Sequence, residues 1–408
     1  MRFVDRWIGA PMCAVLTVVR WLDDLVLRRD PDRPPEKIAV MKLAEQGATV
    51  LAYSALVRAR KMVGAENLYF VVFSENRFIL DLLHVVPTEN VISIRTDGLF
   101  RVASDTLKAV LRMRREGIDA TADFEFFARS SAILSYLSGA RARSGFHGYF
   151  GEASYRGDLM THRLSFNPFL HAAEIFQIII EAFRIPAKDF PAFELTPPPD
   201  LPLPRLEPEE AETREVGQML SEALGTAMLP PIVLLNANCG DLLPLRRWDN
   251  DRYVELARRI LDHHPEVCIV LTGSPSEAPE AEALAAQIGS ARCISFAGRT
   301  TLRQLMVLYG LSELMVTNDS GPAHYATLTS IDVITLFGPE TPAVFGARTA
   351  KSHILWSNLV CSPCVNAFND RQSACRRNRC MELITVDQVF DTVCGVLEKR
   401  RQSRILNS

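Results

Sequence analysis

The sequence of 408 residues lacks a marked excess of charge of either sign. It has 45 Lys and Arg against 48 Asp and Glu, a net charge of −3, so nothing in its overall charge points to a nucleic-acid partner. Nine cysteines do not make a disulfide scaffold in a chain of this length. Three of them, Cys268, Cys293 and Cys394, lie singly within apolar runs, as buried thiols do. We therefore expect a reducing compartment and, from the length, two or three domains.

The N-terminus also lacks a long hydrophobic run and a secretory signal, because no charged start, apolar stretch and small-residue cleavage site follow one another. Thirteen uncharged residues separate Arg6 from Arg20, fewer than the ~20 needed to span a bilayer. Tryptophans flank this stretch and the basic pair 28–29 follows it. The pattern favours an interfacial helix at a membrane surface over a helix packed on the protein itself, although Pro11 is expected to interrupt it.

From residue 37 onward, short apolar strands alternate with helices. Strands are predicted at 37–43 and 67–73, and the alternation continues to a strongly apolar helix at 169–183. Six prolines within 196–210 exclude helix and central strand, so this segment is predicted to be a linker. A second alternating series follows the linker. The whole pattern predicts an α/β protein with two doubly wound, Rossmann-like domains facing a central cleft.

These patterns divide the chain into five predicted parts. They are an N-terminal amphipathic segment 1–36, a first domain 37–195, the proline-rich linker 196–210, a second domain 211–385, and a C-terminal helix and tail 386–408. The last helix is predicted to run from Val386 to Lys399 and to end in a solvated basic tail.

The stretch 313–342 predicts a strand, a polar turn, a helix at 323–328 and a second strand. Asp319 or Ser320 suits the helix N-cap, and Gly321 allows a ligand to approach the backbone closely. Free N–H groups at such a turn attract anions, and the phosphates of a nucleotide are common occupants. We therefore expect a diphosphate site at this turn.

This stretch resembles the signature of glycosyltransferase family 9, the ADP-heptose:lipopolysaccharide heptosyltransferases. Its matching motifs are NDSGPAH at 318–324 and LFGPETP at 336–342. Five further segments match in the family's order: KIAVMKLAEQGATVLAYSAL at 37–56, ARSSAILSYLSGARARSGF at 128–146, RRW at 246–248, LTGSPSE at 271–277 and FAGRTTLRQL at 296–305. The resemblance implies a GT-B fold, transfer of a sugar with inversion, and no metal or other cofactor.

The resemblance also implies a donor site in the second domain. Arg246 would supply the positive charge that a leaving nucleoside diphosphate needs in the absence of a metal. The diphosphate, sugar, ribose and adenine would contact Asp319, Ser320, Gly321, His324, Glu277, Thr301 and Leu302. Taken singly, Asp319 could be only an N-cap, His324 a structural residue and Arg246 a solvated charge. The surrounding motifs favour the binding roles.

The first-domain turn departs from the family pattern. The family's glycine-aspartate is Gly47-Ala48 here, and alanine cannot accept the proton of an acceptor hydroxyl. Glu45, in the same turn, is our hypothesis for the general base, and Asp123 and Glu125 are the next candidates. The first domain would be the acceptor side.

Four cysteines lie close together late in the chain: Cys361, Cys364, Cys375 and Cys380. The spacing of the first pair suits zinc, whereas the second pair is wider than a zinc ribbon prefers. Structural zinc, disulfides and unligated thiols remain alternatives. In each of them we expect a structural role, not a catalytic one.

The predicted function is a glycosyltransferase at the cytoplasmic face of the inner membrane. It would move a heptose from ADP-heptose to a lipopolysaccharide-core or related glycolipid acceptor, with Arg129 contacting an acceptor phosphate or carboxylate. One alternative is a catalytically impaired sugar-nucleotide-binding protein, which Ala48 favours. Another is a different GT-B enzyme such as a sugar-nucleotide epimerase, which would need a pair of carboxylates and no acceptor.

Overall fold

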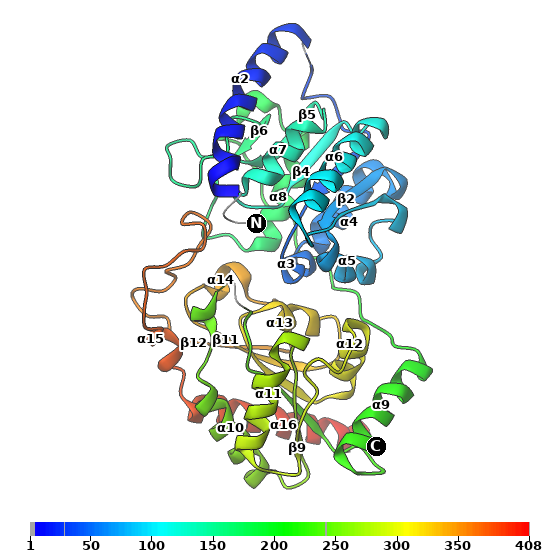
Figure 1. Ribbon diagram of the computed structural model, residues 1–408, viewed down its shortest axis with the longest axis vertical. Helices are drawn as coiled ribbons and strands as arrows, with labels where there is room; N and C mark the ends of the chain where they lie inside the picture. Colours follow the sequence, from blue (N-terminus) through cyan, green and yellow to red (C-terminus); the bar gives the residue numbers. More distant parts are fainter. Residues whose placement is uncertain (1–4, 28, 241–242, 408) are drawn as a thin grey trace. The chain divides into compact units, whose positions relative to one another are not determined.

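The computed structural model describes residues 5–27, 29–240 and 243–407. Arg28 of the predicted basic pair lies outside the described residues, as do Asp241 and Leu242 of the turn before Arg246. The contacts divide the chain into two compact units (Figure 1): unit 1 is Met1–Pro202 with Asn366–Gln372, and unit 2 is Leu203–Val365 with Ser373–Ser408. The segment Asn366–Gln372 thus groups with unit 1, although it lies within the predicted second domain.

Unit 1 contains a six-stranded parallel sheet in the order β3-β2-β1-β4-β5-β6. Its strands are β1 Ile38–Met41, β2 Leu68–Phe73, β3 Val91–Ile94, β4 Ala120–Asp123, β5 Ala142–Phe146 and β6 His162–Leu164. Its helices are α2 Ala10–Leu27, α3 Gln46–Leu51, α4 Tyr53–Val63, α5 Arg77–Leu83, α6 Leu99–Arg115, α7 Arg129–Leu137 and α8 Ala172–Glu181. In the central strand, Ile38 lies opposite Leu68 and Ala120. Strands β1, β2 and β3 are apolar along nearly their whole length because helices cover both faces of the sheet. Strands β5 and β6 also contain polar and charged residues.

Unit 2 contains a second six-stranded parallel sheet, ordered β12-β11-β10-β7-β8-β9. Its strands are β7 Ile232–Asn236, β8 Cys268–Leu271, β9 Cys293–Ser295, β10 Leu314–Asn318, β11 Asp332–Phe337 and β12 Ser352–Trp356. Its helices are α9 Glu210–Leu224, α10 Asn250–His263, α11 Ala278–Ile288, α12 Leu302–Leu311, α13 Gly321–Ala326, α14 Pro342–Phe345, α15 Arg379–Glu382 and α16 Val386–Asn407. When the strands are numbered separately within each unit, both sheets have the same strand order, which is the Rossmann order. The predicted pair of doubly wound α/β sheets is confirmed.

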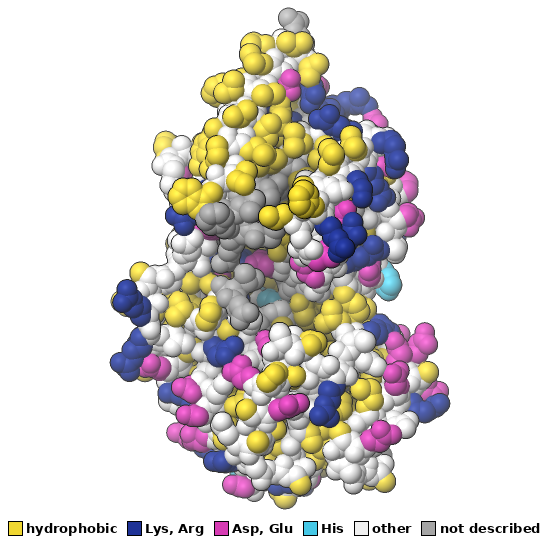
Figure 2. All heavy atoms as spheres, viewed as in Figure 1, with side chains coloured by type: hydrophobic (Ala, Val, Ile, Leu, Met, Phe, Trp, Pro, Cys, Tyr) yellow, Lys and Arg dark blue, Asp and Glu magenta, His cyan; other side chains and the backbone are white. Residues whose placement is uncertain are grey.

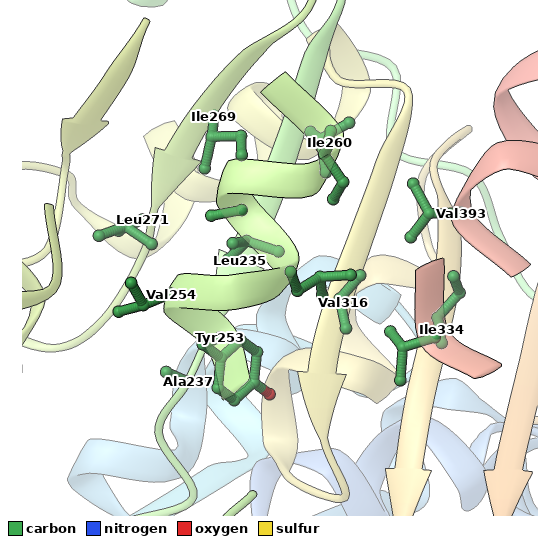
Figure 3. Close-up of a cluster of buried hydrophobic side chains, with 14 of the residues drawn as sticks. Leu235, Ala237, Tyr253, Val254, Ile260, Ile269, Leu271, Val316, Ile334 and Val393 are labelled. Atoms are coloured by element: carbon green, nitrogen blue, oxygen red, sulfur yellow. The ribbon is translucent and has the colours of Figure 1, made fainter. Parts of the chain in front are cut away.

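The core of unit 2 lies between its sheet and two long helices. Figure 3 shows Tyr253 and Ile260 of α10 against Leu235 of the central strand β7, and Val393 of α16 beside Ile334 of β11. All five side chains are almost completely buried. α10 and α16 also contact each other, so the C-terminal helix is an integral part of the core.

The predicted C-terminal end of the last helix is wrong. α16 does not end at Lys399 but continues through Asn407, because Arg400 and Arg404 of its last turns form ion pairs with Glu313, and Arg400 also with Asp332. These pairs attach the basic end of the helix to the amino ends of strands β10 and β11.

Pro11 does not interrupt the N-terminal helix. It is the second residue of α2 and follows a π-helical turn at Asp5–Gly9. Proline is tolerated near a helix start because the first N–H groups have no partner within the helix. None of the helices in the described ranges is long and apolar enough to cross a bilayer.

Candidate functional site

The predicted donor residues all follow the carboxyl ends of strands in unit 2. Arg246 lies in the segment after β7, Glu277 after β8, Thr301 after β9 and Asp319 after β10. In doubly wound sheets this is the edge beyond which ligands bind. The sheet therefore brings to one edge residues that are far apart in the sequence.

A polar turn followed by a helix lies after β10, as predicted, although the helix begins earlier than expected. α13 starts at Gly321, not Ala323, and Ser320 occupies the N-cap position with its hydroxyl donating to the Asn318 carbonyl (3.1 Å). A Cβ at Gly321 would lie only 2.6 Å from the hydroxyl of Tyr325. His324 is buried on the same helix. Since α13 has only six residues, the charge of the site comes mainly from side chains.

Arg246 lies between two buried carboxylates. Its Nη1 is 3.5 Å from Asp319 Oδ2 and 3.6 Å from Oε2 of Glu340, which follows β11. The side chains of Asp319 and Glu340 are each 4% exposed and that of Arg246 is 15% exposed. This cluster combines the predicted cation with the predicted acid of the NDSGPAH turn.

Glu340 is not among the site residues predicted from the sequence, although it lies inside the LFGPETP motif. Burial and the nearby Asp319 carboxylate, which also forms a hydrogen bond with it, raise the pKa of Glu340 to about 8, against the effect of Arg246. The proton that Glu340 retains reduces the negative charge that a bound diphosphate would meet in this cluster.

Asn318, the first residue of the same motif, connects this cluster to the rest of the unit. Its Oδ1 accepts from the Trp248 backbone N–H (3.0 Å) and its Nδ2 donates to the Ala237 carbonyl (2.9 Å). The indole of Trp248 is fully buried and donates to the Ile384 carbonyl (2.9 Å). The RRW segment is thus anchored through its tryptophan, which fixes the position from which Arg246 extends.

The predicted ribose and adenine residues lie in two turns that contact each other. Glu277 accepts from the backbone N–H and hydroxyl of Ser274 (2.7 and 2.8 Å), and Thr301 caps α12. The Gly298 N–H donates to the Gly273 carbonyl (3.0 Å), which joins the turns. Leu302 is partly exposed beside Thr301. Glu277 therefore has a local capping role, and its ribose contact stays a prediction.

In unit 1, Glu45 lies in the turn between β1 and α3 and has a left-handed backbone conformation, with φ 67°. Its carboxylate is paired with Arg371 and lies 3.3 Å from the Lys42 ammonium. The Glu45 side chain is 27% exposed, so part of it remains accessible. Arg371 comes from the segment Asn366–Gln372, whose Phe368 also packs on Phe166 of unit 1 (5.1 Å between ring centroids).

The other two base candidates are held by structural contacts. Glu125 accepts from the backbone N–H groups of Leu43 and Ala44 (2.7 and 2.9 Å) and from Lys42 (3.1 Å). Asp123 is completely buried, is paired with Arg156 and accepts from the Ser131 hydroxyl. Of the three carboxylates, Glu45 has the most exposed side chain.

The remaining acceptor-side residues are buried. Gly47 lies in the first turn of α3. Arg129 begins α7 and donates to the Tyr155 carbonyl (2.7 Å), with Asp5 at 3.5 Å. The Asp5 carboxylate also accepts from the backbone N–H of Ser130 (2.8 Å). Arg129 thus holds the N-terminal segment, and its contact with an acceptor stays a prediction.

All nine cysteines lie in the described residues, and none of them forms a disulfide bond. In the late cluster, Cys364 accepts from the Ser373 hydroxyl (3.2 Å) and Cys375 donates to the Arg377 carbonyl (3.1 Å). The disulfide alternative is therefore not seen. Within the described ranges, the His and Cys side chains that gather closely enough to hold one metal ion are His263, His264 and Cys394.

The N-terminal helix α2 reverses the usual pattern of a surface helix. Its buried residues are Cys13, Thr17 and Arg20, and Arg20 pairs with Asp158 (2.6 Å). Its outer face is almost entirely apolar and, together with the preceding turn, exposes Trp7, Ile8, Met12, Val15, Val18, Val19, Trp21, Leu22, Leu25, Val26 and Leu27. Figure 2 shows hydrophobic side chains gathered along the helix at the top of the view. A large exposed apolar patch of this kind marks an interaction surface.

Relatives in sequence are heptosyltransferases. Residues 127–374 match the model of glycosyltransferase family 9 (heptosyltransferase). Lipopolysaccharide heptosyltransferase 2 of Salmonella typhimurium is 31% identical over 160 residues, which are 38% of this chain and 45% of the relative. The chain thus matches less than half the length of that relative.

Solved structures show the same fold over nearly the whole chain. ADP-heptose LPS heptosyltransferase II of Escherichia coli has a TM-score of 0.64 at 19% identity, covering 90% of this chain and 99% of that one. A second Escherichia coli heptosyltransferase, solved with ADP-2-deoxy-2-fluoro heptose, has a TM-score of 0.56 at 15% identity and covers 88% and 99%. These likenesses establish the GT-B fold. Because the family model covers more than half of the sequence, the chain belongs to glycosyltransferase family 9.

Proposed function

We propose that this protein is an inverting, metal-independent glycosyltransferase that moves a heptose from ADP-heptose to a lipopolysaccharide-core or related glycolipid acceptor. The observation that carries the proposal is the Arg246 guanidinium held between Asp319 and Glu340 at the carboxyl edge of a Rossmann sheet. A guanidinium suits a diphosphate because it offers several hydrogen bonds in a fixed plane. Family membership and the ADP-heptose analogue bound by a structural neighbour support the choice of donor.

In this proposal the bond between the anomeric carbon and the phosphate oxygen breaks, and the nucleoside diphosphate leaves with the electron pair. Arg246 stabilises the developing negative charge, which is where a preorganised cation lowers the barrier most. Asp319 and His324 orient the sugar, while Ser320 and Gly321 offer backbone N–H groups to the phosphates. The acceptor oxygen attacks from the opposite face, so the configuration inverts.

The decisive experiment is a transfer assay with ADP-heptose and a heptose-accepting lipopolysaccharide precursor. Arg246→Gln is expected to lower kcat by about 10²–10³-fold, the effect typical of removing one charge-stabilising group. Arg247→Gln is the matched control, because the adjacent Arg247 pairs with Glu280 (2.8 Å) instead. Equal activity of the two variants would remove Arg246 from the mechanism.

We further propose that Glu45 accepts the proton of the acceptor hydroxyl. It is the most exposed of the three candidate carboxylates, and Lys42 and Arg371 hold it in place. Glu45→Gln should lower kcat by about 10²–10⁴-fold, the usual contribution of a general base, whereas Glu89→Gln at an exposed position should not. Full activity of Glu45→Gln with an unchanged pH profile would exclude this role.

Two alternatives have specific support. Ala48 in place of the family aspartate favours a sugar-nucleotide-binding protein without turnover. The carboxylate pair of Asp319 and Glu340 is the feature that an epimerase would need. Incubation with the donor alone distinguishes the second, because an epimerase alters the sugar nucleotide without an acceptor. Donor binding without any product in either assay would support the first.

We also propose that the enzyme works at the cytoplasmic face of the inner membrane and that α2 lies flat in the lipid surface. Its outer face is apolar, while Arg6 and Arg29 near its two ends are exposed and can contact lipid phosphates. A lipid-linked acceptor would then be presented to unit 1. Burying an exposed leucine contributes about 1.5–3 kcal/mol, so several such residues give stable attachment.

Vesicle flotation tests this localisation. The wild type should float with vesicles of phosphatidylethanolamine and phosphatidylglycerol, and a Val18→Glu, Leu22→Glu variant should remain in the soluble fraction. Met228→Glu, at an exposed apolar position of unit 2, is the control and should float. Flotation of all three proteins alike would exclude α2 as the membrane contact.

A further inference from the structure

A cluster of two histidines and one cysteine lies where α10 ends beside α16. His263 is the last residue of α10, His264 follows it as the C-cap, and Cys394 lies in the middle third of α16. The ring of His263 also contacts Phe390, one turn before Cys394 (5.6 Å between centroids). The two helices thus bring three strong metal-binding groups together from distant parts of the sequence.

The spacing of these groups suits a single metal ion. The ligand atoms of the three residues all lie within 4.8 Å of one another, and Cys394 Sγ is 3.5 Å from His264 Nε2. In a tetrahedral site with metal–sulfur and metal–nitrogen bonds of about 2.3 and 2.0–2.1 Å, the sulfur–nitrogen separation is about 3.6 Å. The observed pair therefore has the separation of two ligands on one ion. The exposed ring of His263 can rotate to complete the third bond.

The other ring nitrogen of His264, Nδ1, lies 3.8 Å from a carboxylate oxygen of Glu266, which is beyond hydrogen-bond distance. A modest rotation of the exposed Glu266 side chain would bring its carboxylate to the position from which it orients a metal-bound imidazole.

We propose that His263, His264 and Cys394 bind a divalent transition-metal ion of the zinc type, with one water molecule as the fourth ligand. Thiolate and imidazole together favour such ions over Mg²⁺ or Ca²⁺, which prefer oxygen ligands. On binding, the Cys394 thiol loses its proton to solvent and the sulfur forms a bond to the metal.

The ion would connect α16 to α10. It lies at the opposite end of α10 from the RRW segment, and a helix of 14 residues is about 20 Å long. The site is therefore separate from the Arg246 cluster, and the proposal does not depend on the proposed function. Its expected effect is on the stability of unit 2, since an ion that binds only the folded state raises its stability.

Cobalt(II) is the probe, because tetrahedral binding with a thiolate ligand gives charge-transfer and visible absorption bands. We expect the full-length wild type to bind one more cobalt ion than the Cys394→Ser variant. Zinc should raise the melting temperature of the wild type more than that of Cys394→Ser. His263→Gln should show the same loss and, since this side chain is exposed, should not impair folding. Glu266→Gln should weaken binding by about 10–100-fold.

Two controls separate this site from other metal-binding groups. His84→Gln changes an exposed histidine of unit 1 and should leave the bands intact. Cys361→Ser removes one thiol of the late cysteine cluster and should leave the Cys394-dependent bands intact. The proposal is overturned if Cys394→Ser and His263→Gln retain the full cobalt spectrum, or if the bands disappear only in Cys361→Ser.

Discussion

Replacing Glu340 by glutamine tests the buried carboxylate pair directly. The pKa of Glu340 is about 8 in the folded chain against its ordinary value of 4.5. Between pH 4.5 and 8 the folded protein therefore keeps a proton that the unfolded chain has lost. The contribution of this proton to the free energy of unfolding is fully present below pH 4.5, falls as the pH rises and is lost above pH 8. Since one pKa unit corresponds to about 1.4 kcal/mol, the total loss is about 5 kcal/mol.

Glutamine keeps the shape of the protonated acid but cannot ionise, so Glu340→Gln should not suffer this loss. We expect the two proteins to have similar unfolding free energies near pH 5, and the variant to be more stable by several kcal/mol at pH 9. Urea unfolding followed by tryptophan fluorescence measures the difference, because Trp248 is buried in unit 2. Donor affinity of the wild type should also fall above pH 8, since a second carboxylate charge then opposes the diphosphate.

Glu280→Gln is the matched control. Its carboxylate pairs with Arg247 and is 33% exposed, so the same chemical change there should leave the pH dependence of the wild type unaltered. Other titrating groups cancel in the comparison. Parallel stability curves for wild type and Glu340→Gln from pH 5 to 9 would show that Glu340 does not hold a proton in the folded state.

Two further variants test packing and charge. Gly321→Ala places a methyl group 2.6 Å from the Tyr325 hydroxyl and should lower the unfolding free energy by about 1–3 kcal/mol. Gly310→Ala is the control and should not lower it, because the space around its Cβ position is open. Equal effects of the two substitutions in thermal unfolding would contradict this prediction. Arg156→Met leaves a completely buried aspartate unpaired and should cost about 3–5 kcal/mol. Arg101→Met breaks an exposed pair and should cost less than about 1 kcal/mol in the same urea titration; a similar loss in both would refute the distinction.

The elements that could be predicted are those with a local signal. The second strand predicted in the stretch 313–342 was the run 332–337, which corresponds to β11 residue for residue. The run is rich in β-branched and aromatic residues, which favour a strand. The turn around Asp319 was also recognisable, since its polar residues, glycine and proline occupy consecutive positions. Local composition was sufficient for both.

Other features depend on residues that are distant in the sequence. The length of α16 depends on ion pairs with Glu313 and Asp332, which no helical pattern reveals. The sequence around Glu340 is that of an ordinary loop, and only the folded sheet places this residue beside Asp319 and Arg246. The apolar composition of α2 was visible, but only its buried residues show that the apolar face points outward.

The segment Asn366–Gln372 has a consequence for how the protein is made. It lies near the end of the chain, yet it belongs to unit 1 and carries the arginine that pairs with Glu45. As domains emerging from the ribosome fold largely in order, the turn after β1 must wait for nearly complete translation to acquire this partner. A gene fragment ending at the linker would therefore encode unit 1 without its last piece, and the two halves cannot be exchanged between relatives by a single cut.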